Sequence, residues 1–287
     1  MQVGAAIVAS RFAVAEVPPL TLAMLRYAIG FLCLLPFALP ALRRLERLPP
    51  ARDLWAMAAL GTGQFGILIA LLNWGLQTVA AGPAALVFGL FPLLTLLLAA
   101  ALGREVVTAR LVLGVLLSIA GVAVSLAAKL QLAGHAASWW GELSVLAAAC
   151  VGALCSVLYR PYLRRYPTVP VSAFAMLASV LFLALIAFGE DWPARVRGLS
   201  ASAWGAIAFV GLSSGIGYFL WLYALKHESP TRVTVFLALN PVTAALLGWA
   251  VLGEPLAPQL LAALVLIGLG LGLASRPAPA NGQASPG

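Results

Sequence analysis

The sequence predicts an all-α integral membrane protein of ten transmembrane helices, arranged as two five-helix repeats of inverted topology. Three observations lead to this fold: the composition, the spacing of apolar runs, and a set of residues that recur at one offset. Of 287 residues, 63% are hydrophobic and only 9% are charged, whereas soluble domains carry about 25% charged residues. Such a chain has too little polar surface to fold as a soluble globule.

Apolar runs separated by charged residues or by Pro and Gly define the spans. A helix needs roughly 20 apolar residues to cross a bilayer, and the sequence offers ten such runs with short loops between them. The predicted spans are 1–16, 18–39, 53–76, 82–102, 108–128, 140–160, 169–189, 202–225, 232–252 and 256–275. The first run is short for a bilayer, which leaves an upstream extension open.

The distribution of the seventeen Lys and Arg residues predicts the orientation. Twelve fall in the loops on the side of the N-terminus and four on the other side, and Arg26 lies within a span. Because basic loops stay in the cytoplasm, both termini are predicted to be cytoplasmic. A positive net charge placed in this way orients the chain and gives no reason to expect nucleic acid as a partner.

An internal repeat appears when the chain is compared with itself at an offset of 149 residues. Scarce residue types coincide without a gap: Arg11 with Arg160, Pro18 with Pro167, Trp55 with Trp204, Gly66 with Gly215, Pro92 with Pro241, Glu105 with Glu254 and Gly121 with Gly270. The predicted repeats are 1–128 and 140–275, followed by a disordered tail over 276–287. Five spans are an odd number, so the second copy would enter the membrane from the opposite side.

Polar and aromatic side chains within spans 3 and 8 are candidates for a substrate site, because such groups are costly against lipid. Ser214, Tyr218 and Trp221 step by four and three residues and therefore share one helical face. Gln64 and Trp74 are the candidates in span 3. The alternative for each is ordinary helix packing, with hydroxyls bonded to carbonyls of their own helix.

Spans 4 and 9 each carry a proline near mid-depth, Pro92 and Pro241, which removes a backbone donor. Irregular backbone at that depth lines a cavity or is buried in protein. Asn240 is a candidate substrate contact because its amide both donates and accepts, and its repeat mate Phe91 would supply an apolar wall. Packing kinks alone remain the alternative for the prolines.

The paired glycines Gly66 and Gly215 are predicted kink or gating positions in spans 3 and 8. Arg26 could meet a substrate carboxylate, or it could extend toward the interface as a structural residue. None of the nine acidic residues lies at mid-depth. This argues against a carboxylate that exchanges a proton for a cationic drug, and against a metal site.

The sequence is identified as a member of the EamA family of the drug/metabolite transporter superfamily by motifs in both halves. They are Val17-Pro18-Pro19 with Leu25-Arg26-Tyr27, Phe91-Pro92-Leu93-Leu94 ending in Gly103-Arg104-Glu105, and Asn240-Pro241-Val242-Thr243 ending in Leu252-Gly253-Glu254-Pro255. The resemblance implies ten helices in two repeats, with spans 5 and 10 outside the substrate path. It is greatest to bacterial inner-membrane exporters of amino acids, including aromatic ones.

This resemblance implies export of amino acids and related small metabolites by alternating access through a central, neutral, aromatic-lined cavity. The protein would work in the bilayer without a cofactor, and a monomer is compatible with the sequence. A sugar or nucleotide-sugar carrier is the alternative within transport, although its diphosphate would require more cations than Arg26. The other alternative is a polytopic enzyme of lipid metabolism, for which clustered aspartates or a nucleophile with a base are missing.

Overall fold

The computed structural model describes residues 2–43, 49–103, 108–133, 139–228, 233, 240–254 and 258–274, and the regular elements in these ranges are all helical. The first half contains α1 (Gln2–Ala13), α2 (Pro19–Arg43), α3 (Ala51–Gly61), a π-helix η1 (Thr62–Ile67), α4 (Leu68–Gly75), α5 (Ala81–Phe88), α6 (Phe91–Ala101) and α7 (Ala109–Ala133).

The second half follows a similar order. It contains α8 (Trp140–Arg165), α9 (Thr168–Ile186), the 3-10 turns η3 (Ala187–Glu190) and η4 (Val196–Gly198) around α10 (Trp192–Arg195), α11 (Ala201–His227), α13 (Asn240–Leu252) and α14 (Pro258–Ala274). The first part of the predicted span 232–252 lies largely outside the described residues, and so does the predicted tail 276–287.

Membrane-spanning length is reached by six helical stretches among the described residues, and four shorter apolar helices occupy the positions of the other predicted spans. The six are Pro19–Arg43, Ala51–Gly75, Ala81–Ala101, Trp140–Arg165, Thr168–Glu190 and Ala201–His227. The shorter helices are Val3–Ala13, Val112–Ser125, Asn240–Leu252 and Pro258–Leu273. The chain is therefore an all-helical membrane protein, with a helix in each predicted span.

Within the described residues, two predicted spans depart from a regular α-helix near their middle. The span that runs from α3 to α4 contains six residues of π-helix, which widen the helix around Gln64 and Gly66. The next span is divided at Gly89 and Leu90, so that Pro92 becomes the second residue of α6. A proline is tolerated there because the first turn of a helix has no partner for its N–H groups.

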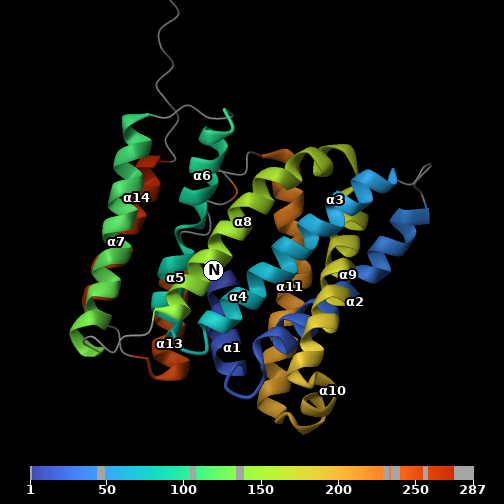
Figure 1. The fold of residues 1–287 in the computed structure, drawn as a ribbon, viewed down its shortest axis with the longest axis horizontal. Helices are drawn as coiled ribbons and strands as arrows, with labels where there is room; N and C mark the ends of the chain where they lie inside the picture. The colour runs from blue at the N-terminus through green and yellow to red at the C-terminus, as the bar shows by residue number, and fades with distance from the viewer. Residues whose placement is uncertain are drawn as a thin grey trace, which may run out of the picture.

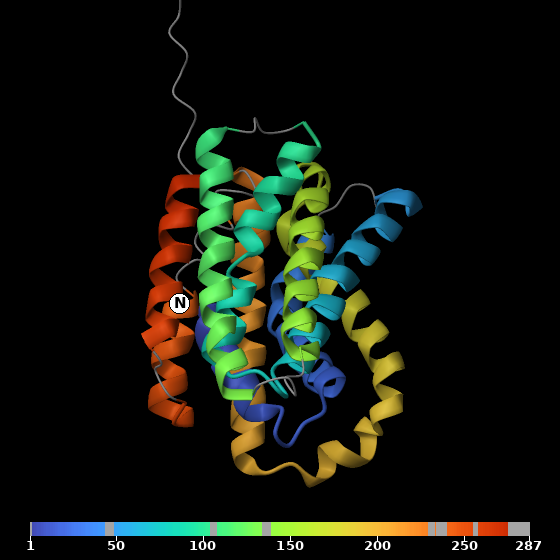
Figure 2. The ribbon, with the colours of Figure 1, turned by 60° about the vertical axis from the view of Figure 1, so that its left-hand side comes forward.

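Helices α7 and α14 lie side by side at one flank of the molecule (Figures 1 and 2). Their crossing is close, because a Cβ on Gly121 would lie 2.7 Å from Cγ1 of Ile267, and one on Gly270 would overlap Oγ of Ser118. The two helices pack chiefly on each other. The remaining long helices form the main bundle, in which α2 packs on α9 and α11, and α4 packs on α8.

Close contacts recur between the halves with their partners exchanged. Gly215 in α11 packs on Gly30 in α2, and at the offset of 149 residues Gly66 packs on Ser179 in α9. Likewise Gly121 meets Ile267, whereas Gly270 meets Ser118. This exchange is the pattern that two copies of one unit produce when a twofold axis relates them.

Candidate functional site

A cavity lies among α1, α2, η1, α4, α5, α6 and α11, and it holds about 660 Å³ of empty space, including the part that opens to the outside. Its lining combines residues from both halves of the chain: α11 supplies Ser213, Ser214, Gly217, Tyr218 and Trp221, and the first half supplies the rest.

Arg26 is the charged side chain of this lining, and it is 5% exposed. Its Nε donates a hydrogen bond to Oγ of Ser214 at 2.6 Å, and that hydroxyl donates in turn to the carbonyl of Val210 at 2.6 Å. The guanidinium carbon lies 5.6 Å from the ring centre of Tyr27, which is within cation–π range. Arg26 therefore points inward and is held in place, and the cavity is cationic rather than neutral as the sequence had predicted.

Four aromatic residues line the cavity, namely Phe88, Phe91, Tyr218 and Trp221. Phe91 lies 5.9 Å from Trp221 between ring centres and 5.5 Å from Phe88. Tyr218 packs edge-on against Phe65 at 4.7 Å and lies 5.5 Å from Tyr27. Because the rings touch one another, each is held by its neighbours, and the wall offers flat apolar surfaces close to the guanidinium of Arg26.

Two polar atoms of the lining residues have no hydrogen-bond partner among the residues that the structure describes. They are Oε1 of Gln64, whose side chain is 3% exposed, and Nε1 of Trp221. Buried polar groups without a partner are costly, and they are compatible with a ligand or water that would satisfy them.

Six of the eight predicted substrate residues line the cavity: Arg26, Gln64, Phe91, Ser214, Tyr218 and Trp221. Trp74 does not; it is 62% exposed and follows the lining residue Leu72 by two positions, which turns it about 200° around the helix. Asn240 is buried but is not part of the lining. A Cβ on Gly4 would lie 2.6 Å from the carbonyl oxygen of Asn240, so α13 packs tightly against α1 at this residue.

The four predicted kink positions have distinct local settings. Pro92 is the second residue of α6, and Pro241 lies in the described part of α13. Gly66 lies in the π-helix, whereas Gly215 lies within the long regular helix α11, where it allows close contact with Gly30. The structure thus gives Gly215 a packing role, and gating remains a prediction.

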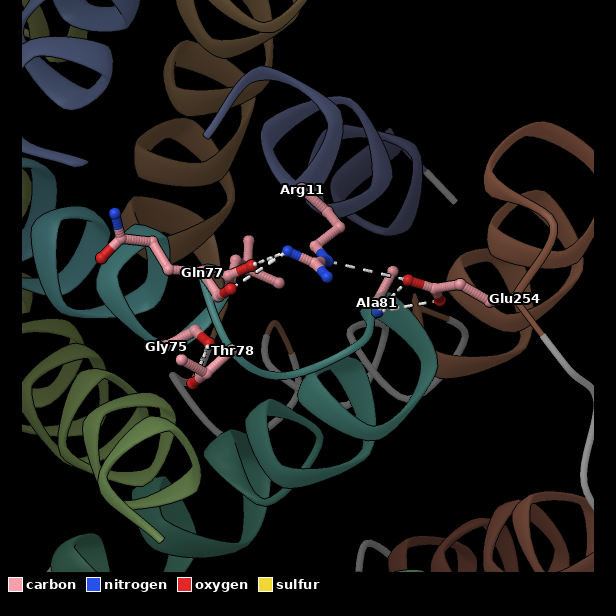
Figure 3. A network of polar contacts seen from close by, with 7 residues as sticks. Arg11, Gly75, Gln77, Thr78, Ala81 and Glu254 are labelled. Carbon is pink, nitrogen blue, oxygen red and sulfur yellow. Dashed lines mark hydrogen bonds and ion pairs between the residues drawn. The ribbon is translucent and has the colours of Figure 1, made fainter. Parts of the chain in front are cut away.

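A separate polar network ties together helix ends from both halves (Figure 3). Nη1 of Arg11 donates to the carbonyls of Leu76 at 2.8 Å and Gln77 at 3.3 Å, and its Nε lies 3.8 Å from Oε1 of Glu254. The carboxylate of Glu254 accepts from the N–H of Ala81 at 3.0 Å, which places a negative charge at the N-terminus of α5. We call these residues the Arg11–Glu254 network.

Comparison with known proteins decides the family. The model of the EamA-like transporter family matches the chain twice, over residues 2–127 and 139–276. The chain belongs to the EamA-like transporter family. The two matches cover both halves separately, in agreement with an internal repeat, and they identify a multi-pass membrane transporter rather than an enzyme.

Relatives of this EamA-like transporter include a probable terminal-alkyne amino-acid exporter of Streptantibioticus cattleyicolor, which is 34% identical over 79% of this chain and 73% of that protein. The uncharacterized inner membrane transporter YedA of Escherichia coli K12 is 31% identical over 86% of this chain and 78% of its own length. A solved crystal structure superposes with a TM-score of 0.66, at 26% identity over 94% of each chain.

Sequence reasoning missed the contribution of α1 to the cavity of this EamA-like transporter. Val3, Ala6 and Ile7 line it, and their spacing of three and one places them on one helical face. This spacing was the one feature of the sequence that could have indicated a lining face on α1. In a span that is apolar all round, however, a lining face cannot be told from a lipid-facing one by residue type.

Proposed function

We propose that this transporter exports amino acids and related small metabolites across the bacterial inner membrane by alternating access. The observation that carries the proposal is a buried guanidinium, that of Arg26, beside an aromatic wall in a cavity between the two halves. Arg can bind a carboxylate through two parallel hydrogen bonds. The rings of Phe91, Tyr218 and Trp221 would pack on the apolar part of the same molecule.

The relative from Streptantibioticus cattleyicolor supports amino acids as the substrate class, because its printed name describes an amino-acid exporter. A nucleotide-sugar is less well supported. Its diphosphate would require several cations, whereas the described lining residues include one cationic side chain, that of Arg26.

Alternating access rests on the exchange of contacts between the repeats. We infer ten spans, with the two halves inverted in the membrane and both termini in the cytoplasm, as the distribution of Lys and Arg predicts. Under this topology the Arg11–Glu254 network lies at the outer face. It joins α1, the turn after α4, the start of α5 and the end of α13, and we propose that it holds the outer end of the path closed.

Transport by purified protein in liposomes tests the proposal. Vesicles loaded with labelled phenylalanine should release it faster with the protein than without it. Tyr218→Ala should slow release about tenfold, because a ring that packs on the substrate contributes on the order of 1 kcal/mol or more. Tyr223→Ala is the matched control, since Tyr223 lies on the same helix, is 50% exposed and is not part of the lining. Equal release by both variants and the wild type would contradict the assigned cavity, and no release of any amino acid would contradict the function.

A further inference from the structure

The charge balance of the cavity restricts what can occupy it. Among the described residues that line the cavity, Arg26 carries the one formal charge, and neither Asp nor Glu is present. The ion pairs found among the described residues join Arg11 to Glu254 and Arg165 to Asp53, and none involves Arg26. A cation that is 5% exposed and has no counter-ion is unfavourable in a site shielded from water.

The hydrogen bonds of Arg26 leave part of the guanidinium unused. Ser214 accepts from Nε, and its own proton is given to the carbonyl of Val210, so the hydroxyl is oriented with a lone pair toward Arg26. Within the described residues, the hydrogen bond from Nε to Ser214 is the one that Arg26 donates, and neither of its terminal nitrogens donates to a protein group. These two nitrogens form the edge that binds a carboxylate in a planar, two-bond arrangement.

The described lining residues offer no negatively charged group that would pair with a positively charged substrate. The ammonium of an amino acid would find neutral acceptors, such as the amide oxygen of Gln64 or the hydroxyls of Ser213 and Tyr218, but no carboxylate in the part of the lining that the structure describes. A zwitterion would therefore leave the occupied cavity with a net charge of about +1, whereas a carboxylate without an ammonium would neutralise it.

We propose that the cavity selects apolar organic monocarboxylates of net charge −1, and that the α-ammonium of an amino acid is dispensable for binding. The substrate class would include 2-oxo acids and N-acylated amino acids with flat apolar side chains. Their carboxylate lies on the terminal nitrogens of Arg26, with Ser214 as the positioning residue, and their apolar part lies against Tyr218 and Trp221. This inference rests on the proposed function, because it concerns the substrate of the same cavity.

Competition against labelled phenylalanine in liposomes tests the inference with four molecules that share one benzyl group. Phenylpyruvate and N-acetylphenylalanine are monoanions, unlabelled phenylalanine is a zwitterion, and phenylalanine amide is a cation. The two monoanions should inhibit at concentrations equal to or below that of phenylalanine, and the amide should require at least about tenfold more. Thermal shifts of the detergent-solubilised protein with each compound give the same ranking without transport.

Substitutions at Arg26 assign the charge selectivity to this side chain. Arg26→Gln should weaken binding of the monoanions by about 30-fold or more relative to binding of the amide. Arg26→Lys should keep part of the preference for monoanions, because lysine keeps the charge but lacks the planar edge. Ser214→Ala should give a smaller loss of the same selectivity. Arg197→Gln is the control, since it removes an exposed cation outside the cavity. If Arg26 had a purely structural role, its substitution would change the binding of all four compounds equally, and that result would overturn the inference.

The outcomes separate this inference from the proposed function. If phenylalanine is transported but both monoanions fail to compete and give no thermal shift in the wild type, the charge inference is overturned and amino-acid export stands. If the monoanions bind and are transported whereas phenylalanine is not, the inference stands and the amino-acid assignment falls. If the cation competes as well as the monoanions, the cavity does not select by charge and the inference is overturned.

Discussion

The crossing of α2 and α11 at Gly30 and Gly215 gives a stability prediction that can be worked from distances. A Cβ added at Gly215 would lie 2.9 Å from the carbonyl oxygen of Gly30, 3.1 Å from its Cα and 3.2 Å from Cβ of Cys33. Two of these atoms are backbone, so they cannot yield by a change of rotamer. Overpacking of this kind costs about 1–3 kcal/mol.

Gly205 provides a matched control on the same helix, because a Cβ there would meet nothing within 4 Å. Both Gly→Ala changes gain up to about 1 kcal/mol of helix propensity, so the difference between them isolates the overpacking. For a chain of this size, 1–3 kcal/mol corresponds to a difference in apparent melting temperature of about 2–6 °C. We expect Gly215→Ala to melt below Gly205→Ala by this margin in detergent. Equal melting temperatures would refute the close crossing.

Three further predictions concern other parts of the molecule. Glu254→Gln removes the charge that Arg11 contacts, so it should increase labelling of a cavity cysteine, Ser213→Cys, by a thiol reagent added from the outer side; unchanged labelling would show that the network does not close that end. Gly121→Leu should lower the melting temperature but leave the affinity for phenylalanine unchanged, because α7 packs on α14 and does not line the cavity; an altered affinity would contradict this separation. Trp74→Ala should leave transport in liposomes unchanged, because the side chain is exposed; a loss of transport would return Trp74 to the site.

Helix positions were predictable because hydrophobic burial and bilayer thickness impose them directly. The predicted span 202–225 corresponds to Ala201–His227, and the apolar character of the last span agrees with the flank position of α14. Helix ends were less predictable: the span predicted to end at residue 160 continues through Pro161 to Arg165. Packing in the bundle decides such ends, and sequence patterns do not record it.

The candidate site shows where pattern reasoning fails. The face formed by Ser214, Tyr218 and Trp221 was predictable because α11 is regular there. The span with Gln64 and Trp74 contains a π-helix, and a wider turn changes which later residues share a face. Asn240 was attractive for its chemistry, but the close approach of α13 to Gly4 depends on tertiary packing.

The sequence contains a feature from which the Arg11–Glu254 network could have been predicted. The two residues are scarce charged side chains at span ends, and the predicted topology assigned both to the same face of the membrane. Opposite charges at one face of a small bundle are candidates for a pair. The backbone partners at Leu76 and Ala81 could not be foreseen, because they depend on how the loop after α4 folds.

Gly103 follows α6 and Gly253 follows α13, and both have a positive φ. Membrane topology at these two glycine turns tests the inverted arrangement most directly. In a chain whose three native cysteines are replaced by serine, single cysteines at Leu102 and Leu252 would be labelled with an impermeant thiol reagent in spheroplasts and in inverted vesicles. Arg43→Cys and Arg197→Cys serve as controls for the inner and outer faces. Inverted halves predict labelling of Leu102→Cys from the cytoplasmic side and of Leu252→Cys from the outer side. Labelling of both from the same side would contradict the inverted repeat and the alternating access proposed from it.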